Sequence, residues 1–256
     1  MRSVWLVLGS VLTVGALVAA TVIVWMAVAL ARNPMEVARR SIAFSGAALN
    51  VKTTSAGVNL FITRGDAGQI VLERRSLWSA AKPVVTEGWD GVNLVLDVAC
   101  PGMDSSGEGF CESDYTLSLP PETALTATAF QGSLGVHGIY GALRLTTTSG
   151  QIGVSGTPAS LWARTDTGSV SGHEFCSENT DVEVGTGHVQ LDFAKPPQQV
   201  RAVVRASGDV NLHLSDRGPY DLVTQGDQVR VRVDKNSQSA RKITAITHEG
   251  EVTIDR

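Results

Sequence analysis

A glycine-led phrase recurs along the second half of the chain and constrains the fold more than any other feature. Each copy has a small or polar residue, then Gly, a polar residue, and alternating Val, Leu or Ile. A period of about 20 residues indicates a solenoid, in which each repeat forms one turn, called a rung below, and buries its apolar face against its neighbours. The repeat glycines are Gly132, Gly150, Gly168, Gly187, Gly208, Gly226 and Gly250.

The residues after each glycine alternate between apolar and polar, which predicts strands with one buried and one exposed face. Glycine before each strand allows the corner to adopt a positive φ. We therefore predict an all-β fold, a single-stranded and β-helix-like β-solenoid with rungs of about 20 residues. A β-sandwich with regular hairpins is the alternative. The residues 252–254 are expected to form the last rung.

The chain divides into four predicted parts. Residues 1–3 form a short tail, 4–31 a hydrophobic helix and 32–45 a juxtamembrane linker. Residues 46–256 form the repeat domain, in which 46–120 are irregular and cap the regular repeats of 121–256.

The segment 4–31 has no charged side chain. As a helix it would extend about 42 Å, against roughly 30 Å for the hydrocarbon layer of a membrane. It exceeds the apolar core of a signal peptide, which is about 7–15 residues long, although 29–31 also fits a cleavage site. Trp5 and Trp25 lie near its ends, where interfacial indoles are expected. The segment therefore predicts a single-pass protein of the cell membrane, in contact with the lipid bilayer through residues 4–31.

Two features of the sequence make opposite predictions for the orientation of this helix in the membrane. Arg32, Arg39 and Arg40 would place the C-terminal domain in the cytoplasm. Cys100 and Cys111 bracket a turn-rich loop whose closure by a disulfide would stabilise the fold in an oxidising compartment. A metal pair is the competing use, but the spacing fits zinc poorly. We expect a disulfide and an extracellular C-terminal domain, with a third cysteine, at position 176, as a buried thiol.

The charge balance argues against nucleic acid as a partner. Of the 21 basic and 25 acidic residues, four and one lie before residue 51, which leaves 17 and 24 beyond it and a net charge of −7. An acidic surface repels a phosphate backbone.

The repeats resemble those of the bacterial putative-adhesin family of β-strand repeat domains (DUF4097). The segments 77–79 and 87–89, Cys100 with Pro101, and Cys111 with the nearby 114–115 carry the same likeness. The style is similar to that of actinobacterial members with one N-terminal membrane helix. The resemblance implies a cell-surface β-solenoid of a family for which adhesion or envelope-stress sensing is proposed and no enzymatic activity is established.

Several residues are candidates for chemical sites. Ser79 and Lys82 match a Ser-x-x-Lys pattern but lack its companion motifs. His188 and His213 could approach each other and a carboxylate if the rungs stack in register, but a stacked polar surface is the preferred interpretation. Calcium binding lacks the nonapeptide signature of β-rolls. The candidate carboxylates for calcium are Asp166, Asp181, Asp192 and Asp209.

Large aromatic and threonine side chains are the remaining candidates for a ligand surface. Trp162, Trp78 and Trp89 are expected as interior plugs or end caps, with ligand binding as the alternative. Aligned threonines would form a flat polar face, either a binding surface or solvated wall: Thr146, Thr147, Thr148, Thr165 and Thr167.

We predict a non-catalytic, membrane-anchored scaffold that binds a cell-wall polysaccharide or an envelope protein. The sequence predicts no catalytic residue, no cofactor, no metal and no small-molecule substrate. An envelope-stress sensor acting through a membrane partner is the alternative, and a hydrolase of surface glycans, with paired carboxylates across rungs, comes third.

Overall fold

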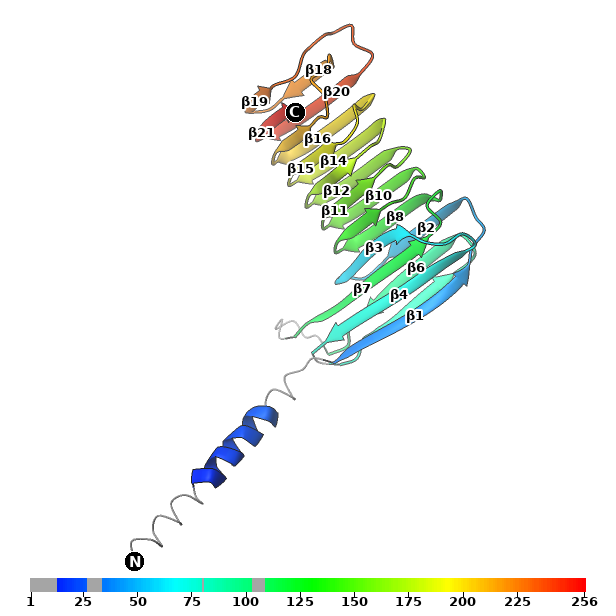
Figure 1. Cartoon of the computed structure of the whole chain (residues 1–256), viewed down its shortest axis with the longest axis vertical. Coiled ribbons are helices and arrows are strands. Elements are labelled where there is room, and N and C mark those ends of the chain that lie inside the picture. The colour runs from blue at the N-terminus through cyan, green and yellow to red at the C-terminus, as the bar shows by residue number, and fades with distance from the viewer. Residues whose placement is uncertain (1–12, 27–33, 80, 103–108) are drawn as a thin grey trace, which may run out of the picture.

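The computed structural model describes residues 13–26, 34–79, 81–102 and 109–256 of the chain. In this part, 21 strands form two sheets, here called sheet A with 11 strands and sheet B with 10 (Figure 1). The one helix among these described residues covers 13–26. The predicted all-β class is therefore confirmed.

Sheet A contains mostly the odd-numbered strands. In spatial order it comprises β1 (Met35–Ala43), β4 (Gln69–Trp78), β7 (Cys111–Leu119), β3 (Val58–Arg64), β9 (Leu134–His137), β11 (Ile152–Gly156), β13 (Val170–Phe175), β15 (Val189–Phe193), β17 (Val210–His213), β21 (Glu251–Asp255) and β19 (Gln228–Val231).

Sheet B contains mostly the even-numbered strands. In spatial order it comprises β18 (Asp221–Gln225), β20 (Lys242–Glu249), β16 (Gln199–Ser207), β14 (Asn179–Thr186), β12 (Leu161–Thr167), β10 (Leu143–Ser149), β8 (Ala124–Gln131), β2 (Ala48–Thr53), β6 (Asn93–Ala99) and β5 (Val84–Trp89).

From β8 onward, consecutive strands lie in different sheets, and each strand pairs in parallel with the corresponding strand of the next rung. One rung thus contributes one strand to each sheet, as the stacked green and yellow strands of Figure 1 show. Antiparallel hairpins, which the β-sandwich alternative requires, do not connect these strands, because parallel neighbours need a crossover. The predicted rungs therefore correspond to pairs of strands in a two-sheet stack.

The core consists of rows of apolar side chains that repeat from rung to rung. Along sheet A, one such row is fully buried, with exposed fractions of 0–1%. Each buried aliphatic side chain contributes about 1.5–3 kcal/mol relative to an exposed one, so the rows supply the main driving force of folding. This row comprises Leu134, Ile152, Val170, Val189, Val210 and Val252.

The repeat glycines form a ladder at the corner between the two sheets. A Cβ atom on Gly168 would lie 1.9 Å from the carbonyl oxygen of Gly150, and one on Gly187 would lie 1.8 Å from that of Gly168. Their φ angles are +138° and +137°, a region that L-residues with side chains rarely adopt. Gly226 differs, because its φ lies outside the positive range and its Cβ would lie 3.1 Å from the carbonyl oxygen of Gly250.

The N-terminal part is built differently from the regular rungs. β4 pairs antiparallel with β1 and with β7, and β5 pairs antiparallel with β6. The predicted linker over 32–45 is corrected by β1, because Met35–Ala43 pairs along its whole length with β4. Residues 32 and 33 lie outside the described part.

The C-terminal strands do not end the stack, contrary to the expectation for residues 252–254. β20 and β21 insert between the preceding rung, β16 and β17, and the rung formed by β18 and β19. The terminal rung is therefore β18–β19, which Figure 1 shows beyond the red β20 and β21.

The predicted transmembrane helix requires a correction. Within the described residues, no helix combines the length and the apolar character needed to cross a membrane. The described helix covers only 13–26, and residues 4–12 and 27–31 of the predicted span lie outside the described part. The predicted single-pass localisation in the cell membrane is therefore wrong.

The glycine ladder generates the first testable prediction. Gly168→Ala should lower the free energy of unfolding by more than about 2 kcal/mol, because the added Cβ meets a backbone carbonyl and the φ is unfavourable. Gly153→Ala, in the preceding rung, is the matched control, since the nearest atom to its Cβ would be Ser171 Oγ at 3.8 Å. Denaturant unfolding of both variants measures the difference. Equal losses would contradict a steric role for the ladder.

Candidate binding surface

The outer face of sheet B carries a connected group of charged and aromatic side chains in the regular rungs. It lies across four neighbouring strands, β10, β12, β14 and β16. Because adjacent parallel strands are about 4.8 Å apart, side chains at equivalent positions touch across them. This group, called the Arg–Trp patch below, comprises Arg144, Trp162, Arg164, Asp181, Glu183, Arg201 and Arg205.

Two arginines lie over the indole ring at the centre of the patch. The Cζ atom of Arg144 is 3.6 Å from the ring centroid of Trp162, and that of Arg164 is 4.5 Å from it. Cation–π contacts of this kind contribute about 0.5–1 kcal/mol each at exposed sites. They fix the ring against the sheet, so the indole is positioned before any ligand arrives.

Carboxylates of β14 connect the arginines of β12 and β16. Asp181 accepts hydrogen bonds from Arg164 Nη2 at 2.8 Å and from Arg201 Nη1 at 3.0 Å. Glu183 Oε2 accepts from Arg201 Nη1 at 3.1 Å. Exposed ion pairs contribute little individually, but a network orders all of its side chains together.

The arginines of this network lower the pKa of Asp181. Partial burial works to raise the pKa of its carboxyl group, but the hydrogen bonds and charges of Arg164 and Arg201 outweigh burial and hold the pKa below its ordinary value. Asp181 is therefore an anion at neutral pH and presents only acceptors.

A groove of about 280 Å³ lies beside the indole ring. Trp162, Asp181 and Arg201 line it, together with the amides of Asn179 and Gln199. An aromatic edge beside a carboxylate, a guanidinium and two amides offers both apolar contact and paired donors and acceptors. Such a groove suits a ligand that carries many hydroxyl groups.

A row of polar side chains follows the outer face of sheet A. His173 Nδ1 lies 2.9 Å from Asp192 Oδ2, and His213 Nδ1 lies 2.9 Å from Asp255 Oδ1. His137 Nδ1 similarly contacts the hydroxyl of Ser155 at 2.7 Å. The row is a hydrogen-bonded surface that stabilises adjacent rungs.

The expected pairing of His188 with His213 does not occur. His188 lies before β15 and contacts Asp209, with 3.5 Å between Nδ1 and Oδ2, whereas His213 ends β17 and contacts Asp255. In the described residues, no group of three or more His, Cys, Asp or Glu side chains is arranged to hold a metal ion.

The four aspartates considered for calcium are spread over the two faces. Asp181 and Asp166 lie on sheet B and pair with arginines, the latter with Arg205 at 3.0 Å. Asp192 and Asp209 are on sheet A beside histidines. The structure does not bring the four together.

Ser79 and Lys82 also have separate partners. The hydroxyl of Ser79 accepts a hydrogen bond from the backbone N–H of Phe110 at 2.8 Å, and Lys82 forms an ion pair with Glu36. The Ser-x-x-Lys pattern therefore does not form a nucleophile and base pair.

The tryptophans and threonines occupy different environments. Trp89 packs edge-on against Phe44, with ring centroids 6.1 Å apart, and Trp78 lines a small pocket beside Arg74. Trp162 lies on the outer face of sheet B.

The expected threonine face is only partly formed. Thr147 and Thr165 point into the core and are 1–2% exposed, whereas Thr148 and Thr167 are exposed and Thr146 is half-buried. The aligned threonines therefore do not share one surface.

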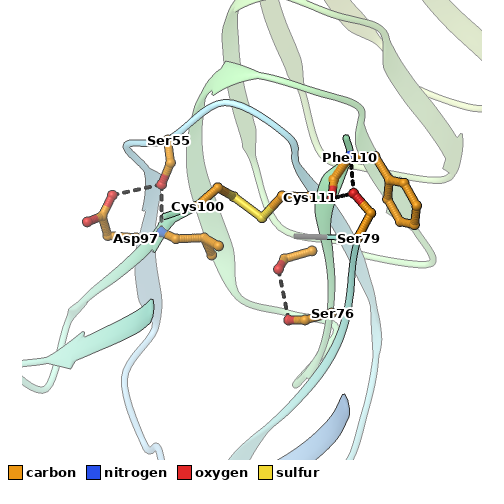
Figure 2. Close-up of a disulfide and its surroundings, with 9 residues drawn as sticks. Ser55, Ser76, Ser79, Asp97, Cys100, Phe110 and Cys111 are labelled. Atoms are coloured by element: carbon orange, nitrogen blue, oxygen red, sulfur yellow. Dashed lines mark hydrogen bonds between the residues drawn. A yellow bond between two sulfur atoms is a disulfide. The ribbon is translucent and has the colours of Figure 1, made fainter. Parts of the chain in front are cut away.

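The predicted disulfide between Cys100 and Cys111 is present. Cys100 follows β6 of sheet B and Cys111 begins β7 of sheet A, so the bond joins the two sheets (Figure 2). Ser55 lies beside it, where its hydroxyl donates to Asp97 Oδ1 at 2.7 Å and accepts from the N–H of Val98 at 2.6 Å. Cys176 carries a half-buried free thiol.

No family model and no curated protein matches the chain. The similar solved structures include three crystal structures. A putative adhesin from Bacteroides fragilis has a TM-score of 0.52 and 12% sequence identity, with 86% of this chain and 97% of that chain covered. A putative adhesin from Parabacteroides distasonis has a TM-score of 0.48 at 9% identity, covering 86% and 97%. A putative cell adhesion protein from Clostridium sporogenes has a TM-score of 0.38 at 13% identity, covering 88% and 98%.

The Bacteroides fragilis likeness shows a shared fold. The identities are too low to transfer a function from any of the three proteins. All three are named for adhesion and none for an enzymatic activity.

The disulfide leads to a prediction on stability. Replacing Cys100 and Cys111 by Ser should lower the free energy of unfolding by about 3 kcal/mol, because the bond closes a short loop in the unfolded chain. Denaturant unfolding without reductant measures the loss, and Cys176→Ser is the control that should leave stability nearly unchanged. A double variant as stable as the wild type would contradict this role.

The pKa of Asp181 leads to a prediction on pH dependence. Since the folded pKa lies below the unfolded one of about 3.9, its contribution to stability is present above that pH and is lost as the pH falls through the folded pKa. Asp181→Asn should therefore flatten the decline of the free energy of unfolding between pH 6 and pH 3. Thr126→Ala, an uncharged change on the same face, should keep the wild-type slope. An unchanged slope in Asp181→Asn would refute the proposed coupling.

Proposed function

We propose that this chain is a non-catalytic binding scaffold of the adhesin type, and that its Arg–Trp patch contacts an envelope polysaccharide. In this proposal the two-sheet stack acts as a β-solenoid, a rigid support whose outer faces present side chains at fixed spacing. We also propose that the chain is a member of the putative-adhesin family (DUF4097), on the strength of its repeats and of the fold shared with the Bacteroides fragilis protein.

The groove beside Trp162 is the observation that carries the proposal. Its indole, the carboxylate of Asp181 and the guanidinium of Arg201 are held by a common network, so little side-chain entropy is lost on binding. Neighbouring sugar hydroxyls match a carboxylate or guanidinium that contacts two of them at once, and the sugar's C–H groups contact the part of the indole that lines the groove.

Rigidity favours a repeating ligand. Equivalent positions recur on successive strands about 4.8 Å apart, so a polymer laid across the strands meets a series of contacts. Several weak contacts along one chain combine through effective concentration, which suits adhesion better than a deep pocket does.

A retention assay tests the proposal. Full-length protein is incubated with isolated bacterial cell-wall polysaccharide, and the retained fraction is compared with that of an unrelated β-domain. Trp162→Ala should reduce retention on the order of tenfold, as expected for an aromatic anchor. Phe61→Ala is the matched control, because Phe61 is an exposed aromatic on sheet A, at 43% exposure.

Two results would count against the proposal. Wild-type retention no greater than that of the unrelated domain would reject polysaccharide as the ligand. Equal retention by Trp162→Ala and Phe61→Ala would reject the Arg–Trp patch as the contact surface.

A further inference from the structure

The terminal rung exposes residues that every neighbouring rung buries. Val229 of β19 pairs with Val252 of β21, and Val231 pairs with Ile254. Val252 and Ile254 are fully buried, as is Val210 one rung further in, whereas Val229 and Val231 are 43% and 39% exposed. The apolar row of sheet A therefore reaches the end of the stack without a covering strand among the described residues.

The other half of the same rung is closed. Leu222 of β18 is only 5% exposed, and Tyr220 and Val233 beside the rung are buried. The N–H of Tyr220 donates to Asp234 O at 2.9 Å, and its hydroxyl donates to Asp216 Oδ1 at 2.5 Å. The exposure of β19 is thus specific to one sheet and is not a general loosening of the chain end.

The backbone of β19 also offers hydrogen bonds at this edge. Arg232 N–H donates to Ile254 O at 2.8 Å, toward β21. Successive peptide groups of a strand point to opposite sides, so those of Val229 and Val231 point away from β21, along the open edge of the sheet.

The side chains at this edge are basic on the outer face. Arg230 lies on β19 and forms an ion pair with Glu251 of the adjacent strand β21. Arg232 directly follows β19, is exposed, and has no ion pair among the described residues. A strand added at the edge would place its alternate side chains against these two guanidinium groups.

We propose that the edge of β19 binds an extended peptide segment of a partner protein by strand addition, and that this segment alternates acidic and β-branched residues. Its β-branched side chains cover Val229 and Val231, and its carboxylates face Arg230 and Arg232. β21 already satisfies this pattern on the other side of β19, where Glu251 meets Arg230 and Val252 meets Val229. Strand addition of this kind takes its affinity from the main chain and its specificity from alternate side chains.

A second copy of this chain fits the edge less well. Antiparallel pairing of β19 with itself that places Val229 opposite the partner's Val231 also places Arg230 opposite Arg230, and like charges directly across a strand pair are destabilising. An acidic partner removes this repulsion. The inference concerns the end of the stack and does not depend on the polysaccharide surface proposed above.

The test uses a fluorescent peptide of sequence Val-Glu-Val-Glu-Val-Glu-Val and full-length protein, with binding followed by fluorescence anisotropy. The matched peptide with Lys in place of Glu should bind on the order of tenfold more weakly. Arg232→Glu should reverse the preference between the two peptides. Arg75→Glu, an exposed arginine on β4 near the other end of sheet A, should leave it unchanged.

A second measurement locates the contact. Amide hydrogen exchange followed by NMR should show new protection at Val229 and Val231 when the Glu peptide is bound. An N-methylated peptide, which cannot donate main-chain hydrogen bonds, should lose most of the affinity.

Several outcomes would overturn the inference. Equal affinity for the Glu and Lys peptides, or protection that maps outside β19, would reject an acidic strand at this edge. Concentration-dependent dimerisation of the wild type, with amide protection at Val229 and Val231 in the absence of peptide, would identify a second copy as the occupant instead. Retention on polysaccharide should be unaffected by Arg232→Glu, so failure here and failure of the proposed function are distinguishable.

Discussion

Close contact between successive corners is the constraint on which the rest of the structure depends. The N–H of Gly150 donates to Thr167 O at 2.9 Å, and that of Gly168 donates to Thr186 O at 3.0 Å, so each corner is bonded to the next. At this separation a Cβ atom would overlap the carbonyl oxygen of the preceding glycine. The parallel pairing of both sheets, the alignment of the buried rows and the alignment of the outer faces all require that contact.

The period of the glycines was sufficient to predict the rungs, because the interval between copies equals the chain length of one turn. It did not predict the order of the last rungs. The copy at Gly226 matches the repeat weakly in sequence. It also lacks the close contact made by the other repeat glycines, in agreement with the position of β19 at the end of the sheet. The strand β1 was missed for a related reason. It carries no glycine-led phrase, and its partner β4 is distant in sequence, so no local signal distinguishes it from a linker.

The Arg–Trp patch could not be recognised as a site from its residues alone. Arg144, Trp162, Asp181 and Arg201 are separated by 18, 19 and 20 residues and become neighbours only through the register of β10, β12, β14 and β16. The same period of about 20 residues relates these outward-facing positions of sheet B. It therefore carries a signal that could have aligned them. Histidines and aspartates of sheet A illustrate the limit of such alignment, because a shift of a few residues along the strand separates His188 from His213.

The insertion of β20 and β21 between earlier strands has a consequence for synthesis. Rungs from β8 to β17 can form in the order in which the ribosome makes them. Each of these strands pairs with a strand that has already been synthesised, which is called its template below. The segment 221–231 cannot, because its template is β20 and β21, made only afterwards. During translation this segment therefore stays unpaired until β20 and β21 have been made. The terminal rung can form only after the chain has been synthesised through Asp255.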